Sequence, residues 1–270
     1  MVIEHLLSTR NFEGSALLER MNVSSDVLVI NQVQTTSSRA FEEFSFRGYA
    51  VRVFNYNERG IGISRKRALE HARGDILLIC DDDMCYVSGY KDKIVHAYES
   101  KPDADIIFFK VEREHNDSRP QAHQAQGIHH VKFYNALRYG AVNISLTRKA
   151  VTNYNLGFDE RFGDSLFKSG EDSVFIMDAY HKGAHLYSSS DCVATVDLSE
   201  SSWFTDYNAE YLQNRGAIFY RISKRNYKLL CAQFALRRKN LFSDDYTFCS
   251  MMRHMEQGKQ VFKRTYERKL

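Results

Sequence analysis

The chain has 270 residues, of which 43% are hydrophobic and 26% charged, so it is long enough for one large domain of ordinary globular composition. Intrinsic disorder is excluded, because the hydrophobic content is not low and the formal net charge is only +3. A membrane-spanning helix is not expected either, because no segment approaches the roughly 18 consecutive apolar residues that one requires.

The five cysteines and the N-terminal segment indicate where the protein works. The number of cysteines is odd, they form no Cys-x-x-Cys pair, and a chain of this length does not need disulfides. The first ten residues show no basic region followed by a long apolar stretch, as a signal peptide would. We therefore expect a reducing, cytoplasmic location.

Positive charge is concentrated at the C-terminal end. Residues 211–270 contain 14 Lys/Arg against four Asp/Glu, whereas the rest of the chain is net acidic. A solvated helical face explains this, and so does docking on an anionic membrane or formation of a homodimer through the same helices. Nucleic acid is not expected, because no recognised motif accompanies the charge. The candidate membrane contacts are Arg237, Arg238, Lys239, Lys263, Arg264, Arg268 and Lys269.

The first part of the chain alternates between expected strands and helices. The expected strands are 2–7, 26–30, 49–54 and 76–80, and the expected helices are 15–21, 39–47 and 64–72. Ser8-Thr9-Arg10-Asn11 reads as a polar turn, and Gly74 as the stop of the third helix. This alternation predicts right-handed βαβ units and a parallel sheet, hence an α/β fold.

The second part is less regular. Expected strands are 105–111, 141–146, 185–187 and 192–196, expected helices are 90–99, 148–154 and 173–181, and the chain reads as mainly helical from Tyr207 onward. The polar segment 112–130 is rich in His and Gln and lacks periodicity, so we interpret it as a long flexible loop of functional importance. No Pro/Gly/Ser-rich linker divides the chain.

Three consecutive aspartates, Asp81, Asp82 and Asp83, directly follow the buried-type strand 76–80. Their mutual repulsion is costly without a cation, and carboxylate oxygens are the ligands that Mg²⁺ and Mn²⁺ prefer. In open parallel sheets, ligands collect at the carboxyl ends of strands. The residues therefore indicate a metal site beside a phosphate-bearing ligand, although a solvated acidic turn also explains them.

Glu171 and Asp172 open an expected helix after a glycine. Acidic residues in a first turn are favoured by the helix dipole alone, but a carboxylate held there can also act as a general base toward a hydroxyl group. Arg65, at the start of another helix after Gly60-Ile61-Gly62, could lie beside a pyrophosphate or simply on a charged surface. The glycines fit neither the dinucleotide fingerprint nor the P-loop, and the histidines show no zinc-site spacing.

Three sequence blocks, in this order, resemble family 2 glycosyltransferases, which are inverting enzymes with the GT-A fold. Gly60-x4-Arg65, Ala72-Arg73-Gly74-Asp75 and Asp81-Asp82-Asp83 are similar to the arginine-bearing helix, the A-x-G-(D/E) turn and the D-x-D motif of that family. Residues 157–162 (Gly-Phe-Asp-Glu-Arg-Phe) are similar to its G-F-D-E-x-F segment, and residues 170–172 to its E-D motif. The resemblance spans about residues 2–200.

The resemblance implies a GT-A, Rossmann-like, mostly parallel central sheet flanked by helices, with a helical C-terminal extension. Residues 1–205 would form the catalytic domain, with a nucleotide-sugar-binding half (1–110) and an acceptor-binding half (111–205). Residues 206–270 would form the basic extension. No resemblance of the same specificity covers that extension.

The implied reaction is metal-dependent transfer of a hexose-type sugar from a UDP-sugar to a hydroxyl of a glycan or lipid-linked glycan. The α-linked donor sugar becomes β-linked, in cell-surface polysaccharide synthesis, with Mn²⁺ or Mg²⁺ as cofactor. The enzyme would be cytoplasmic and peripheral at the inner face of the membrane. Two alternatives remain: a nucleotidyltransferase, although its usual glycine-rich loop is absent, and a non-catalytic sugar-nucleotide-binding scaffold of a synthesis complex.

The resemblance also implies roles for individual residues. Asp172 would be the catalytic base, and Glu171 and Asp159 would lie on the acceptor side. Thr9, Asn11, Asn31, Arg65, Asp81 and Asp82 would bind the nucleotide sugar, and Asp83, Asp81 and Asp197 would surround the metal. Two positions depart from the family pattern: Asn31 stands where an aspartate is frequent, and Asp197 lies where many members carry a metal-binding histidine.

Overall fold

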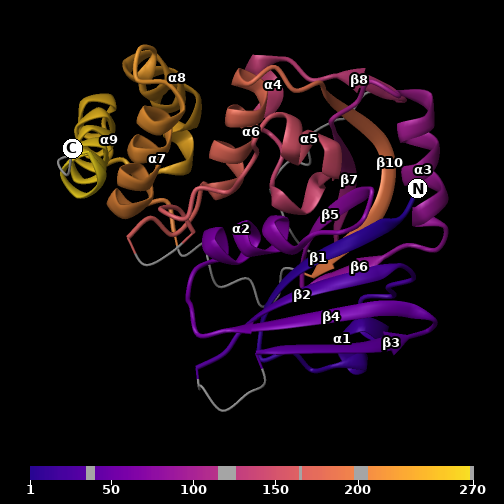
Figure 1. Cartoon of the computed structure of the whole chain (residues 1–270). Coiled ribbons are helices and arrows are strands. Elements are labelled where there is room, and N and C mark those ends of the chain that lie inside the picture. Colours follow the sequence, from indigo (N-terminus) through magenta and orange to yellow (C-terminus); the bar gives the residue numbers. More distant parts are fainter. Residues whose placement is uncertain (35–39, 115–125, 164–165, 198–205, 268–270) are drawn as a thin grey trace.

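The computed structural model describes residues 1–34, 40–114, 126–163, 166–197 and 206–267, and its strands belong to one ten-stranded sheet (Figure 1). The strands are β1 (Ile3–Arg10), β2 (Asp26–Gln32), β3 (Phe41–Phe46), β4 (Tyr49–Tyr56), β5 (Ile76–Asp81), β6 (Met84–Tyr86), β7 (Ile106–Glu114), β8 (Ile128–His130), β9 (Ile144–Thr147) and β10 (Leu186–Asp197). The helices are α1 (Ser15–Arg20), α2 (Ile61–His71), α3 (Tyr90–Ser100), α4 (Phe133–Ala136), α5 (Arg148–Asn153), α6 (Glu171–His181), α7 (Ala209–Ile222), α8 (Tyr227–Arg238) and α9 (Phe248–Tyr266), with short 3-10 turns η1 (Ala141–Asn143) and η2 (Lys239–Leu241).

The strand order is β3-β4-β2-β1-β5-β9-β7-β10-β6, and β8 pairs with β10. The run β4-β2-β1-β5 is parallel, as the alternation of strands and helices predicted. Beyond β5 the sheet is mixed, because β9 runs antiparallel to both β5 and β7. The structure thus confirms an α/β fold with flanking helices and a helical C-terminal region.

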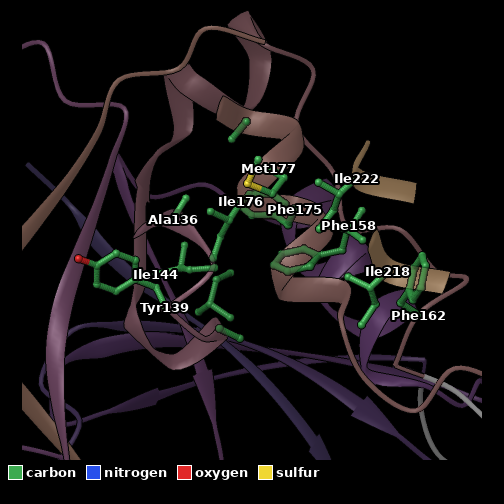
Figure 2. Packing of buried hydrophobic residues seen from close by; sticks show 14 of the residues in the cluster. Ala136, Tyr139, Ile144, Phe158, Phe162, Phe175, Ile176, Met177, Ile218 and Ile222 are labelled. Carbon is green, nitrogen blue, oxygen red and sulfur yellow. The ribbon is translucent and has the colours of Figure 1, made fainter. Parts of the chain in front are cut away.

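Helices cover both faces of the sheet, because successive residues of the buried strands point to opposite sides. Leu6 of β1 belongs to the core beneath α2 and α6, whereas Leu7 belongs to the core beneath α1 and α3. Figure 2 shows part of the first core, in which Phe158 stacks on Phe175 of α6 with ring centroids 4.3 Å apart and lies near Ile218 of α7. The helices α7, α8 and α9 gather beyond α6 and α2 (Figure 1).

The helix expected at 39–47 is wrong: residues 41–46 form β3, antiparallel to β4. The cause is the two-residue connection Arg47-Gly48, in which both residues have positive φ, 50° and 83°. Such a turn matches the twist of a hairpin and brings Phe46 opposite Tyr49. Residue 39, where the helix was expected to begin, lies outside the described residues.

Several boundaries also differ from expectation. The polar turn expected at residues 8–11 is mostly strand, because β1 continues through Arg10. The expected strands 185–187 and 192–196 are one bulged strand, β10, which begins at Leu186 and leaves His185 outside. The expected loop 112–130 contributes residues 112–114 to β7 and 128–130 to β8, and residues 115–125 lie outside the described residues.

Gly74 does not stop α2, which ends at His71 with Ala72 in an extended conformation. Its role is to leave room for Glu4 of β1: a Cβ on Gly74 would lie 2.6 Å from the Cβ of Glu4. The buried Glu4 carboxylate accepts hydrogen bonds from the backbone N–H groups of Arg73 and Gly74 and from the guanidinium of Arg52. A charged residue in a central strand is tolerated here because it is fully paired.

The C-terminal helices cross at two glycines. A Cβ on Gly216 of α7 would lie 1.9 Å from the backbone oxygen of Met255, and one on Gly258 of α9 would lie 1.8 Å from that of Gln213. The helix backbones therefore touch, with the apolar face of α9, including Phe262, buried against α7. In the described part of the chain, none of the helices is long and apolar enough to span a bilayer.

Candidate functional site

The predicted site residues converge at the carboxyl ends of β1, β2 and β5. Parallel pairing sets Thr9 of β1 beside Asn31 of β2, and Ser8 of β1 beside Asp81 of β5. The N-terminus of α6, which carries Asp172, approaches the same edge although it lies about 90 residues further along the chain.

Arg65 of α2 joins the two acidic motifs. Its guanidinium donates from Nη2 to both oxygens of Asp81, at 2.7 and 3.0 Å, and from Nη1 to Oε1 of Glu171 at 2.5 Å. The side chains of Arg65 and Glu171 are 4% and 9% exposed, so their ion pair is buried, whereas Asp81, at 31%, keeps one side open to solvent. Although burial opposes the charge, Asp81 and Glu171 together raise the pKa of Arg65, which stays a cation. Arg65 therefore fixes the D-x-D end of β5 against the start of α6.

The position of α2 depends on small residues that sequence reasoning overlooked. Ser64 donates a hydrogen bond to Ser8 of β1 at 2.9 Å, and Gln32 of β2 donates to the carbonyl of Gly60 at 2.9 Å. A Cβ on Gly62 would lie 2.2 Å from the carbonyl oxygen of Phe162. Gly62 thus lets α2 pack directly against the G-F-D-E-x-F segment. A glycine near the start of a helix was the feature of the sequence that could have indicated this close contact.

Glu171 and Asp172 occupy the first turn of α6, after Gly170 with φ 107°. Burial first, and the negative charge of Asp172 second, raise the pKa of Glu171 to about 7, against the opposing effect of Arg65. Asp172 is half-buried, and its Oδ1 accepts a hydrogen bond from the N–H of Ser173. Its other oxygen, Oδ2, faces Gly140, where a Cβ would lie 3.6 Å away. Within the described residues no hydrogen bond engages that oxygen, and the role of Asp172 as a base stays a prediction.

Of the other residues predicted to bind the nucleotide sugar, Thr9, Asn31 and Asp82 already form hydrogen bonds within the protein. Thr9 donates a hydrogen bond to Oδ2 of Asp82. Asn31 accepts from the backbone N–H of Phe12 at 3.0 Å and donates to Oδ1 of Asn55 at 2.7 Å. In this structure Asn31 therefore holds the turn after β1. That turn contains Asn11, an exposed residue in the left-handed conformation with φ 56°.

Asp83 and Asp197 meet where β6 and β10 pair. The N–H of Asp197 donates to the carbonyl of Asp83 at 3.1 Å. Although Asp83 remains exposed as a residue, partial burial of its carboxyl and the charges of Asp81, Asp82 and Asp197 raise its pKa to about 6. Asp197 thus lies close to Asp83, and its role beside a metal stays a prediction.

The donor set fits a metal that takes only part of its ligands from protein. Within the ranges that the structure describes, no group of three or more His, Cys, Asp or Glu side chains is arranged to hold a metal by itself. Mg²⁺ is typically bound through one or two carboxylates together with substrate phosphates. Asp81 at the end of β5 and Asp83 just after it match that pattern, and the charge of Asp81 contributes to the raised pKa of Asp83.

Asp159 is tied to the C-terminal helices. Its carboxylate accepts from Arg161 at 2.5 to 2.6 Å and from Nε of Arg221 of α7 at 2.8 Å, and Arg221 also pairs with Asp178 of α6. Against the effect of burial, the two arginines lower the pKa of Asp159. These contacts give Asp159 a structural function, and its acceptor-side role stays a prediction.

Comparison with known proteins places this arrangement in a family. The model of glycosyl transferase family 2 matches residues 26–183. No curated protein sequence matches significantly. Among solved structures, S. aureus TarS 1–349 in complex with UDP-GlcNAc aligns with a TM-score of 0.68 and 14% identity, covering 99% of this chain and 92% of that one. The structure of S. aureus TarS 1–349 in complex with UDP aligns with a TM-score of 0.65 and 14% identity, covering 100% of this chain and 92% of that one.

A longer TarS structure aligns with a TM-score of 0.62 and 15% identity, and the match covers 91% of this chain but only 45% of that one. At such identities these similarities establish the fold alone, which is that of TarS and agrees with the expected GT-A architecture. Because the family model spans more than half of the sequence and includes Arg65, Asp81 and Asp172, the chain belongs to glycosyl transferase family 2.

Proposed function

We propose that this protein is an inverting glycosyltransferase that transfers a sugar from a UDP-sugar to a hydroxyl of a glycan acceptor in cell-surface polysaccharide synthesis. The observation that carries the proposal is the buried Arg65, which binds Asp81 and Glu171 at once and so gathers the D-x-D and E-D motifs at one edge of the sheet. A purely structural acidic turn would not need a buried cation shared with a helix 90 residues away.

Asp172 is the proposed base. The acceptor hydroxyl gives its proton to Oδ2, the acceptor oxygen forms a bond to the anomeric carbon, and the bond from that carbon to the diphosphate oxygen breaks with its electron pair leaving on the diphosphate. The N–H of Ser173 and the N-terminal dipole of α6 stabilise the carboxylate before the reaction. Attack opposite the leaving group yields the β-linkage.

Asp83, Asp81 and, less directly, Asp197 would hold Mn²⁺ or Mg²⁺. A divalent cation there would neutralise the diphosphate as it departs and relieve the repulsion that raises the pKa of Asp83. Arg65 would act at the same edge as a fixed positive charge, oriented by its two carboxylates.

Thr9, Asn11, Asn31 and Asp82 are proposed to line the nucleoside side. UDP as the donor nucleotide is supported by the structural likeness to TarS, whose structures contain UDP and UDP-GlcNAc. To recognise the uracil base, the Asn31 amide would have to give up its hydrogen bond with Phe12 or with Asn55, or use the hydrogen-bonding capacity that these two bonds leave free.

The acceptor is proposed to be a glycan on a lipid carrier, with the enzyme at the inner face of the membrane. All five cysteines lie in the described part of the chain and none forms a disulfide, which suits a reducing compartment. Of the seven basic residues proposed as membrane contacts, Arg268 and Lys269 lie outside the described residues.

The test is transfer from a panel of UDP-sugars with Mn²⁺ or Mg²⁺. Asp172→Asn should lower kcat by roughly 10²- to 10⁴-fold, because the base is lost, while UDP binding changes little. Asp92→Asn, which removes an exposed carboxylate from the first turn of α3, is the matched control and should keep full activity. If no UDP-sugar binds with or without metal, the proposal fails; if donors bind but nothing is transferred to any glycan, a non-catalytic scaffold is favoured.

A further inference from the structure

The outward face of α8 carries two leucines that are largely exposed. The opposite face of this helix is buried through Tyr227, Cys231 and Ala235, spaced four residues apart. Leu229 and Leu236 are 68% and 72% exposed. They are seven residues apart, so at about 100° per residue they point in nearly the same direction, away from the core.

Positive charge surrounds these leucines. Lys228 and Arg237 flank them on the helix, Arg225 precedes the helix and Lys239 follows it; all four are exposed. Residues 222–243 contain no Asp or Glu. Among the residues that the structure describes, none of these four basic side chains forms an ion pair with a carboxylate. The surface therefore has an apolar centre and an uncompensated basic rim.

We propose that this α8 face, made of Leu229, Leu236 and the four basic residues Arg225, Lys228, Arg237 and Lys239, docks on an anionic lipid surface. Apolar side chains in the middle of a basic helix face match the pattern by which helices lie in the membrane interface. The leucines would enter the boundary between headgroups and acyl chains, while the cations contact lipid phosphates. The biological purpose, which is access to a lipid-linked acceptor, rests on the proposed function; the binding itself does not.

Other occupants fit the surface less well. Two copies of the face brought together would juxtapose their basic rims, and like charges facing each other are unfavourable. A nucleic acid would satisfy the rim but would leave the leucines in water. Helix α8 lies away from the sheet (Figure 1), and the exposed fractions of Leu229 and Leu236 show that this face is accessible. An anionic membrane satisfies the apolar centre and the rim together.

The experiment measures co-sedimentation of the full chain with vesicles of phosphatidylcholine and phosphatidylglycerol at about two to one, and with phosphatidylcholine alone. Each basic residue near an anionic surface contributes about 1 kcal/mol, which is roughly a 5-fold change in the partition coefficient. Lys228→Gln/Arg237→Gln removes two such residues and should therefore bind the mixed vesicles roughly 30-fold more weakly. Arg138→Gln/Lys149→Gln removes one arginine and one lysine exposed elsewhere, at α4 and α5, and should bind within about 3-fold of wild type.

Leu229→Ser/Leu236→Ser should bind the vesicles more weakly than wild type both at low salt and at about 0.5 M salt. Lys228→Gln/Arg237→Gln should differ from wild type only at low salt, because about 0.5 M salt screens the electrostatic attraction. Far-UV circular dichroism confirms that each variant is folded. Equal binding to both vesicle types, or an equal loss in the Arg138/Lys149 control, would overturn the proposal. The proposal would also be overturned if light scattering showed that the wild type is a dimer, and if Leu229→Ser/Leu236→Ser dissociated this dimer without changing vesicle binding.

The two proposals fail separately. Asp172→Asn should bind vesicles as wild type does, because that residue lies on α6. If the protein binds vesicles but transfers no sugar, the proposed function is refuted and the α8 docking proposal stands. If it transfers sugar to a soluble acceptor but does not bind vesicles, the docking proposal is refuted and the proposed function stands.

Discussion

Replacement of Arg65 by methionine tests whether the buried cation holds the site together. Methionine keeps much of the apolar stem but leaves Asp81 and Glu171 without their shared partner. Glu171 is nearly inaccessible, and its Oε2 has no hydrogen-bond partner among the described residues. Removing one member of such a buried pair costs about 3–5 kcal/mol in the free energy of unfolding.

The cost should depend on the second partner and on pH. Adding Glu171→Gln to Arg65→Met removes the uncompensated charge, so the double variant should be roughly 1–3 kcal/mol more stable than additivity predicts. In Arg65→Met the pKa of Glu171 rises further above its unfolded value of about 4.3, so the folded state binds more protons than the unfolded state. Stability therefore falls as pH rises from about 4.3 through the folded-state pKa, and the loss is larger at neutral pH than at about pH 5.

Urea unfolding followed by far-UV circular dichroism measures these differences for the single variants, the double variant and a control. The control is Lys66→Met on the same helix, which breaks an ion pair to Glu160 with side chains 40% and 51% exposed and should cost less than about 1 kcal/mol. The reasoning is refuted if Arg65→Met costs no more than Lys66→Met, if the loss does not depend on pH, or if the two site substitutions are additive.

Three further predictions follow from other contacts. Gly216→Ala should lower the free energy of unfolding by about 1–3 kcal/mol, although alanine has the better helix propensity, because the added Cβ meets the backbone of α9. In the same urea titration, Gly157→Ala is the control: nothing lies within 4 Å of a Cβ there, so the free energy of unfolding should change by less than about 0.5 kcal/mol. Burial lowers the pKa of His5 to about 3, so the stability that neutral His5 contributes is lost as pH falls below about 6.5. His5→Phe should reduce the pH dependence of the free energy of unfolding by about 2.3 kcal/mol between pH 6.5 and 4.5, and a wild-type His5 imidazole NMR signal that titrates near 6.5 would contradict this. Asp83→Asn should weaken Mn²⁺ binding to the UDP complex by at least about 10-fold in calorimetry while UDP binding without metal is unchanged; equal Mn²⁺ affinity would exclude Asp83 as a ligand.

Much of the site could be predicted from local patterns because strand ends and helix starts carry it. The apolar run ending at Asp81 had to be a buried strand, and acidic residues after Gly170 had to open a helix, so both motifs were located without the fold. What local patterns could not show is the use of each group: Asn31 is engaged by Phe12 and Asn55, and that depends on contacts across the sheet.

The errors in the predicted elements have physical causes. β3 was taken for a helix because its hairpin turn has Arg47 at positive φ, where glycine or asparagine would have been the usual signal. β6 was missed because three residues make a strand only by pairing with β10, more than 100 residues away. Tertiary pairing, rather than intrinsic propensity, determines such short strands.

The pairing of Glu4 has a consequence for the order in which the chain can fold. β1 precedes all of its partners in the chain, yet it lies inside the sheet between β2 and β5, and the carboxylate of Glu4 needs Arg52 and the N–H groups of residues 73 and 74. The pairing of this strand therefore cannot be completed until the chain as far as β5 has left the ribosome. Until then it carries an unsatisfied charge, which keeps a lone apolar strand hydrated and discourages premature association with other chains.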